Sequence, residues 1–209
     1  MKVSADGMLA IARFEGVVPA PYLDAAGVWT FGIGHTAAAG PPDPATMPRG
    51  MPEDLEAGIR EAFRVFRNDL ARYEADVSRA VTAQLEQHEF DALVSFHFNT
   101  GGIARAELTR RLNEGDKAGA AAAFMNWRRP ASIIPRREAE VCLFVTGRYP
   151  GGPIPVWAVD GTGEIRWSEP VRRLTAGEAR ALLPARGPDM RLGLWLARAL
   201  ELIRKLLRR

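Results

Sequence analysis

Two carboxylates and a hydroxyl group lie close together near the start of the chain. Glu15 is followed nine residues later by Asp24, and Thr30 comes six residues after that. Cleavage of an acetal requires a proton for the departing oxygen, and a nucleophile or a positioned water molecule on the opposite face. Two carboxylates in unlike environments can divide these tasks. The three residues are therefore suited to opening a glycosidic bond with water.

The local sequence favours a different role for each residue. Glu15 follows Phe14 at the apolar end of a predicted helix, where desolvation favours the protonated form that a general acid needs. Asp24 lies in a polar turn and is expected to be ionised. Thr30 follows that turn, where its hydroxyl can hold the water that Asp24 activates. Taken singly, the three residues have an ordinary interpretation as a helix end, a turn former and a strand residue.

The surrounding sequence predicts the elements that position these side chains. Ser4 is expected to cap a short helix that leads up to Glu15. From Ala20 to Ile33, aromatic and β-branched residues flank a glycine-containing turn, which is typical of a small β-hairpin. The glycine- and proline-rich residues 37–52 predict a loop.

Downstream of this loop the pattern is helical. From Pro52, apolar residues recur at a period of 3.6 and predict one long helix that bridges two lobes. Thr82 is expected to cap a central helix that ends at the Asn99-Thr100-Gly101-Gly102 sequence. Shorter helices are expected over residues 104–113, 116–127 and 135–146. After Arg148, two short β segments, Val156 to Asp160 and Glu164 to Trp167, predict a surface hairpin.

Three groups of residues resemble one known family. The first includes Phe14-Glu15-Gly16 and Gly32-Ile33-Gly34-His35, the second is Phe90 to Phe96 with Asn99, and the third is Arg136 to Glu140. Together with the Glu15, Asp24 and Thr30 spacing, they are similar to the phage-type lysozymes, glycoside hydrolase family 24. The resemblance covers residues 4 to 147. It implies an α+β, mostly helical lysozyme-like fold with a small N-terminal β-hairpin lobe, a long connecting helix and a helical C-terminal lobe.

The resemblance also implies an activity and a set of roles. The family hydrolyses the β-1,4 bond between N-acetylmuramic acid and N-acetylglucosamine in peptidoglycan. By this likeness Glu15 is the general acid, and Asp24 and Thr30 manage the attacking water in an inverting reaction. Further roles implied by the resemblance fall on Ser95 and Asn99 in the substrate cleft, on Arg136 or Arg137 as the partner of Glu15, and on His35 paired with Asp69 as a structural element.

The bulk composition predicts a soluble chain that needs no cofactor. With 209 residues and 47% hydrophobic side chains, the chain can bury one substantial core. Its one cysteine, Cys142, allows no intramolecular disulfide and no cysteine-based metal site. His88 and His97 lack a further ligand set, so no metal site is expected. No segment is long and apolar enough to span a bilayer, and no signal peptide is expected at the N-terminus.

The C-terminal part is expected to extend beyond the 1–147 catalytic domain. Residues 148–188 form a glycine- and proline-rich extension. Residues 189–209 contain six basic and two acidic residues and an apolar stripe, which predicts a basic amphipathic helix. This helix is suited to anionic lipid or lipopolysaccharide, although it could also dock on the catalytic domain or on a second copy. Nucleic acid is not expected as a partner, because the catalytic part is nearly neutral.

Together these features predict an endolysin muramidase. It would be made in the host cytoplasm, reach peptidoglycan through a membrane lesion made by a separate holin, and cause host lysis. One alternative is a lytic transglycosylase on the same fold, which gives 1,6-anhydro products and needs no water-positioning pair. Another is a non-catalytic membrane-active or wall-binding protein. The presence of Asp24 and Thr30 favours hydrolysis over both.

Overall fold

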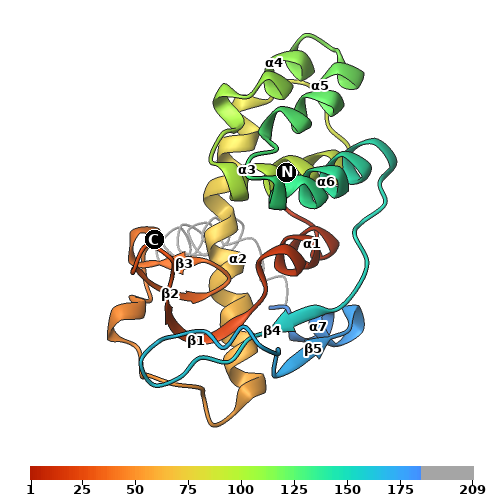
Figure 1. The fold of residues 1–209 in the computed structure, drawn as a ribbon. Coiled ribbons are helices and arrows are strands. Elements are labelled where there is room, and N and C mark those ends of the chain that lie inside the picture. The colour runs from red at the N-terminus through yellow and green to blue at the C-terminus, as the bar shows by residue number, and fades with distance from the viewer. Residues whose placement is uncertain (185–209) are drawn as a thin grey trace, which may run out of the picture.

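The computed structural model describes residues 1–184, which form two lobes joined by one long helix (Figure 1). The small sheets lie in the lower lobe and α3 to α6 form the upper lobe. The α-helices and strands are, in chain order, α1 (Ala5–Glu15), β1 (Val18–Leu23), β2 (Trp29–Gly32), β3 (His35–Thr36), α2 (Leu55–Ala80), α3 (Gln87–Thr100), α4 (Glu107–Asn113), α5 (Lys117–Ala123), α6 (Ile134–Thr146), β4 (Ile154–Val156), β5 (Arg172–Leu174) and α7 (Ala176–Leu182). The α+β class and the two-lobed arrangement predicted from the sequence are confirmed.

The first helix ends at the residue that the sequence singles out. Ser4 caps α1 by accepting a hydrogen bond from the backbone N–H of Gly7 at 2.9 Å, so the predicted cap is confirmed. At the other end, Gly16 adopts a φ of 75°, which a residue with a side chain rarely adopts. The helix therefore stops at Glu15 and the chain turns into β1.

A three-stranded antiparallel sheet follows α1, in the order β1, β2, β3. Tyr22 of β1 lies opposite Thr30 of β2, and Thr30 in turn lies opposite Thr36 of β3. The predicted hairpin is confirmed, and the third strand makes Thr30 a central residue of the sheet. This register places the phenol ring and the threonine side by side.

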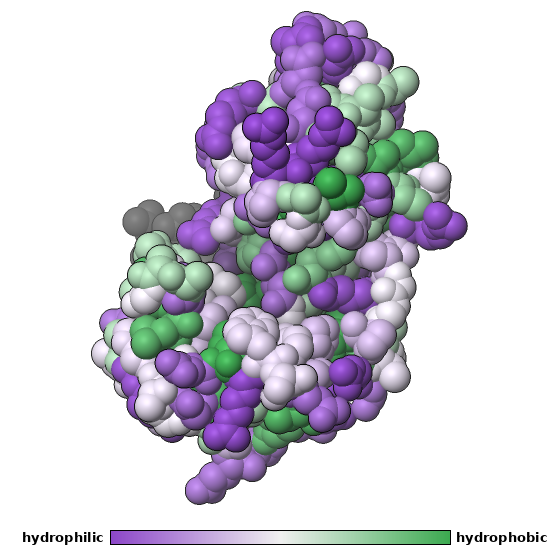
Figure 2. All heavy atoms as spheres, viewed as in Figure 1, coloured by the Kyte–Doolittle hydropathy of each residue, from purple (hydrophilic) through white to green (hydrophobic). Residues whose placement is uncertain are grey.

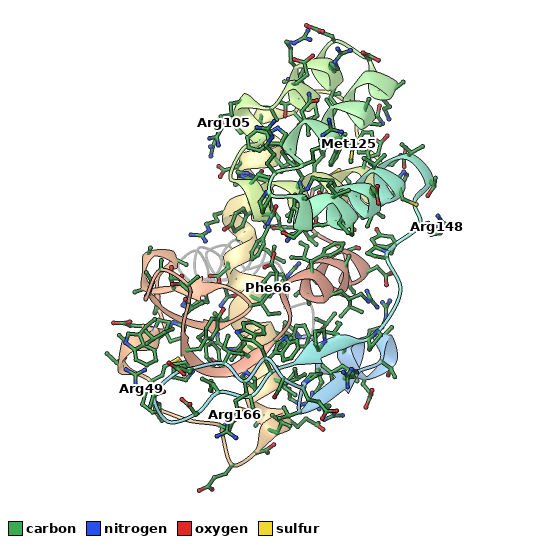
Figure 3. All side chains as sticks on the ribbon, viewed as in Figure 1. Arg49, Phe66, Arg105, Met125, Arg148 and Arg166 are labelled. Carbon is green, nitrogen blue, oxygen red and sulfur yellow. The ribbon has the colours of Figure 1, made fainter. Side chains whose placement is uncertain are left out.

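The long helix α2 forms the link between the lobes. Its apolar stripe is buried, as the helical period predicts, and the stripe consists of Ile59, Phe63, Phe66, Leu70 and Val77. Phe66, labelled in Figure 3 near the middle of α2, makes an edge contact with Phe98 of α3, with 5.5 Å between the ring centroids. The central helix is thereby packed against α2 at the junction of the lobes.

The central helix α3 begins later than its sequence predicts. Glu86 and Glu89 form a reciprocal capping box at its N-terminus, so the prediction of a cap at Thr82 is wrong. The backbone N–H of Thr82 instead donates to Asn113 Oδ1 at 2.8 Å. Residues 81–86 therefore form a connection fastened to α4 rather than a first helical turn.

The extension after residue 148 packs on the lower lobe, and its strands differ from the prediction. β4 and β5 pair with each other, with Ile154 opposite Leu174, and both residues are buried in the main core. The predicted strands at residues 156–160 and 164–167 are reduced to one bridge between Val159 and Ile165. The predicted turn keeps backbone hydrogen bonds from Asp160 to Glu164 and from Arg166 to Ala158, whereas Trp157 donates its backbone N–H to Val17, just before β1.

The basic helix predicted over residues 189–209 lies outside the described residues. Among residues 1–184, no helix is long and apolar enough to cross a membrane.

Candidate active site

The acid predicted from the sequence contacts the opposite lobe through one arginine. Nη1 of Arg136 on α6 donates to Oε1 of Glu15 at 2.6 Å. Of the two arginines that the sequence left open, Arg136 is therefore the partner of Glu15. Glu15 is 28% exposed at its side chain, so its carboxyl group is accessible at the junction between the lobes.

Arg136 is itself held from several sides. Its Nε donates to Glu140 Oε1 at 3.1 Å, and its Nη2 donates to the backbone carbonyl of Ser95 at 3.2 Å. Its guanidinium carbon also lies 5.0 Å from the centre of the Phe14 ring, a cation–π contact. Because every nitrogen of the guanidinium has a partner, Arg136 presents one fixed Nη1 to Glu15.

A second buried arginine shares the carboxylate of Glu140. Arg137 has its Nη1 2.8 Å from Glu140 Oε2, a close ion pair without the alignment of a hydrogen bond. Its Nη2 donates to Asn99 Oδ1 at 2.7 Å. Burial raises the pKa of the Glu140 carboxyl, and the charges of Arg136 and Arg137 and the hydroxyl of Ser95 oppose that rise. Glu140 is thus the one carboxyl group that both buried arginines share.

The hydrogen bonds and ion pairs around Glu140 change the role expected for Ser95, one of the two residues predicted in the substrate cleft. Ser95 is only 1% exposed and donates its hydroxyl to Glu140 Oε1 at 2.7 Å, so it supports the network and does not line a cleft. The expectation of cleft exposure fails because the hydroxyl faces α6 rather than the junction. Asn99 is exposed, and its carboxamide is oriented by Arg137 beside a cavity of about 380 Å³.

Asp24 organises the hairpin turn with one of its two oxygens. Its Oδ1 accepts the backbone N–H groups of Ala26 at 2.8 Å and Val28 at 2.9 Å. This arrangement fixes the carboxylate plane and, among the described residues, leaves Oδ2 without a hydrogen-bond partner. Thr30 is 3% exposed and donates its hydroxyl to the carbonyl of Val28 at 3.1 Å. One turn therefore positions both residues.

Tyr22 is a site residue to which sequence reasoning gave no role. Burial raises its pKa to about 12, and the negative charges of Glu15 and then Asp24 add to the rise, while the backbone N–H of Gly34 opposes it. Tyr22 is thus a half-buried phenol of the hairpin whose pKa responds to both carboxylates. Its position opposite Thr30 comes from the sheet register, which the sequence did not specify.

We expect Tyr22 to ionise near pH 12 instead of near 10. The unfolded chain loses this proton first, so folding stability falls as the pH rises from about 10 to 12 and is unaffected by Tyr22 below that range. Spectrophotometric titration of the wild type and of Tyr22→Phe isolates this residue by difference. A difference spectrum that titrates near pH 10 would contradict the burial of the phenol, which is the largest cause of the rise.

His35 and Asp69 form the structural pair that the resemblance implies. Nδ1 of His35 lies 2.9 Å from Asp69 Oδ2, and its Nε2 lies 2.7 Å from the carbonyl oxygen of Pro42. The carbonyl can only accept, so Nε2 carries a hydrogen and is not free to act as a base. Burial raises the pKa of Asp69, and the contact with His35 opposes this. The pair fastens β3 and the following loop to α2.

The described residues hold no group of three or more histidine, cysteine, aspartate or glutamate side chains placed to bind a metal ion. They do contain a glutamate that is paired with an arginine, Glu15, at the junction of the two lobes. They also contain an aspartate and a buried threonine, Asp24 and Thr30, which are positioned by one turn. A lysozyme-like fold with such a site defines a glycosidase class.

Comparison with known proteins identifies the family. A family model described as phage lysozyme matches residues 12–140, and the chain belongs to this family. An endolysin of Acyrthosiphon pisum secondary endosymbiont phage 1 is 36% identical over 69% of this chain and 98% of its own length. The chain is a peptidoglycan-hydrolysing glycosidase of the endolysin type, as the sequence predicted.

Two solved structures are similar to this one along nearly their whole length. The muramidase domain of SpmX from Asticaccaulis excentricus is 32% identical, covers 69% of this chain and 98% of its own, and has a TM-score of 0.58. A mutant of P22 lysozyme is 30% identical, covers 70% of this chain and 99% of its own, and has a TM-score of 0.59. The family match ends before the extension that begins at residue 148.

Proposed function

We propose that the chain hydrolyses the β-1,4 bond between N-acetylmuramic acid and N-acetylglucosamine with inversion of configuration. Glu15 protonates the departing glycosidic oxygen. Asp24 accepts a proton from the attacking water, and Thr30 helps to hold that water on the opposite face of the sugar. Asn99 contacts the substrate from the upper lobe.

The observation that carries this assignment is the unlike setting of the two carboxylates. Glu15 is bound to an arginine of the opposite lobe, whereas Asp24 is bound to backbone N–H groups of a turn. Both carboxylates act on the same phenol. Two such groups on either side of a bound acetal can serve as acid and base, and Oδ2 of Asp24 provides an acceptor for water.

Replacement of Asp24 by asparagine tests the base. The amide oxygen of the new side chain can keep the bonds that Oδ1 accepts from Ala26 and Val28, so the turn is preserved while the basic carboxylate is lost. We expect hydrolysis of purified peptidoglycan to fall by about 10²- to 10⁴-fold, the usual contribution of general base catalysis. The matched control is Asp43→Asn, since Asp43 is an exposed aspartate that likewise accepts a backbone N–H two residues ahead, from Ala45.

Product analysis distinguishes hydrolysis from the transglycosylase alternative. Mass spectrometry of digested peptidoglycan is expected to show reducing muramyl ends, and NMR of early products is expected to show inversion at the anomeric carbon. Predominantly 1,6-anhydro ends would overturn the water-based mechanism. Unchanged hydrolysis by Asp24→Asn would remove Asp24 from the mechanism and leave the rest of the site in question.

We also propose a membrane role for the basic segment of residues 189–209. It combines cationic side chains with an apolar stripe that contains Trp195. In this proposal the chain is made in the host cytoplasm, a separate holin releases it, and the segment contacts anionic lipid on the way to peptidoglycan. Equal binding of the full chain and of a chain ending at Pro188 to anionic vesicles would reject the lipid contact.

A further inference from the structure

The extension lies directly against the two segments that carry the carboxylates. Val17 donates its backbone N–H to Pro155 and accepts one from Trp157, both at 2.9 Å. Leu23, the neighbour of Asp24, donates its backbone N–H to Gly163 at 2.8 Å. Figure 1 shows the loop between β4 and β5 crossing in front of β1, below α1. The loop is therefore fixed beside the catalytic hairpin at both ends of β1.

One tryptophan of this loop contacts the backbone next to the acid. A Cβ atom added to Gly16 would lie 2.7 Å from Nε1 of Trp157, so no side chain fits between them. Gly163 packs in the same way against Trp29 of the hairpin, where an added Cβ would lie 2.6 Å from the ring. These two glycines bring the loop within contact of the residues that follow Glu15 and Asp24.

A second tryptophan of the loop is exposed. Trp167 is 63% exposed and makes an edge contact with the half-buried Trp157, with 5.1 Å between ring centroids and 63° between their planes. The adjacent Arg166 donates its backbone N–H to Ala158 at 2.9 Å, and Figure 3 shows its side chain at the outer edge of the lower lobe. The backbone bond and the contact with Trp157 thus hold an exposed indole in one place.

The loop that carries this pair lies on the face of the lower lobe that Figure 1 shows in front of β1. Figure 2 shows this face hollowed between the lobes, with pale side chains of intermediate hydropathy over the front of the lower lobe. An exposed aromatic side chain that is held in one place offers a flat apolar face to a ligand, and little side-chain entropy is lost on binding. Carbohydrate is the class of ligand that a glycosidase already binds.

We propose that Trp157 and Trp167 form an additional saccharide-binding subsite, which holds sugar units of the glycan strand beyond the bond that is cleaved. A pyranose ring presents a face of C–H groups, and the negative face of an indole attracts them while its area excludes water. Trp167 supplies the stacking face, and Trp157 fixes its orientation from beside Gly16. The proposal rests on the proposed function, since it extends the same glycan strand past Glu15.

Binding to chains of different length tests the subsite. Trp167→Ala in the full chain, combined with Glu15→Gln to prevent turnover, is expected to bind long soluble glycan strands about two- to tenfold more weakly, the usual range for one aromatic contact. Disaccharide binding is expected to stay unchanged. Trp167→Phe is expected to restore most of the affinity. Val145→Ala, an exposed apolar residue of α6 in the upper lobe, is the control.

Turnover provides a separate measurement. With Glu15 intact, Trp167→Ala is expected to raise the KM for long strands while leaving kcat and the activity on short fragments unchanged. Equal affinity of Trp167→Ala and Val145→Ala for long strands would overturn the subsite but leave the proposed function standing. Failure of the proposed function would be recognised differently, by hydrolysis that persists in Glu15→Gln alone.

Discussion

Glu15→Gln is expected to abolish peptidoglycan hydrolysis, with a loss of at least about 10³-fold, because the departing oxygen then has no proton donor. The substitution should leave the fold intact. A glutamine at this position can still accept the 2.6 Å hydrogen bond from Arg136 through its amide oxygen. The rate of turbidity loss of purified cell walls measures the activity, and thermal unfolding checks the fold.

A matched control separates loss of the acid from loss of an ion pair. Glu61 is an exposed carboxylate that also pairs with an arginine, Arg64 on the same helix. Glu61→Gln therefore removes an arginine-bound carboxylate away from the site and is expected to leave activity unchanged. Substantial hydrolysis by Glu15→Gln would remove Glu15 from the proton-transfer step, whatever the control does.

The contact with Arg136 fixes the position of the acid. Oε1 of Glu15 accepts the hydrogen bond from Nη1 of Arg136 at 2.6 Å, and among the described residues Oε2 has no hydrogen-bond partner. A sugar that enters the junction can therefore bring its glycosidic oxygen to Oε2.

Local signals explain which parts of the fold could be predicted from the sequence. Ser4 and Gly16 mark the two ends of α1, and the helical period marks α2, because these features depend on neighbouring residues alone. The prediction of a cap at Thr82 is wrong, because the capping box of Glu86 and Glu89 starts α3 four residues later. This box is also a local signal, whereas the bond from the Thr82 backbone N–H to Asn113 is a tertiary contact.

The difference between local signals and tertiary contacts also explains which site residues and roles could be predicted. Glu15 and Asp24 occur in a recognisable spacing along the chain. The function of Ser95 and Glu140 depends on a contact between α3 and α6, at a separation of 45 residues. Glu140 offered one local signal, its position four residues after Arg136 on the same helix, which is the spacing of an ion pair. The periodicity of the sequence does not indicate whether such a pair is buried.

Substitution of Glu140 is expected to have the largest effect on stability, because its carboxyl group is buried. Glu140→Ala leaves the charges of Arg136 and Arg137 without their shared carboxylate, at side chains that are 6% and 0% exposed. Breaking a buried pair in this way costs about 3–5 kcal/mol of unfolding free energy, which corresponds to a fall in Tm of roughly 10 °C for a chain of this size. Activity should fall as well, because the guanidinium that contacts Glu15 loses an anchor.

The electrostatic part of this effect can be isolated by three further variants. Glu140→Gln keeps the volume and the acceptor for Ser95 but loses the charge, so it should recover the packing part alone. Glu138→Ala, an exposed glutamate on the same helix, is expected to be nearly neutral. Combining Glu140→Ala with Arg137→Met removes one stranded charge and should cost less than the sum of the single changes. Strict additivity would show that Arg137 and Glu140 are not coupled, and would leave Arg136 as the only partner whose orientation depends on Glu140.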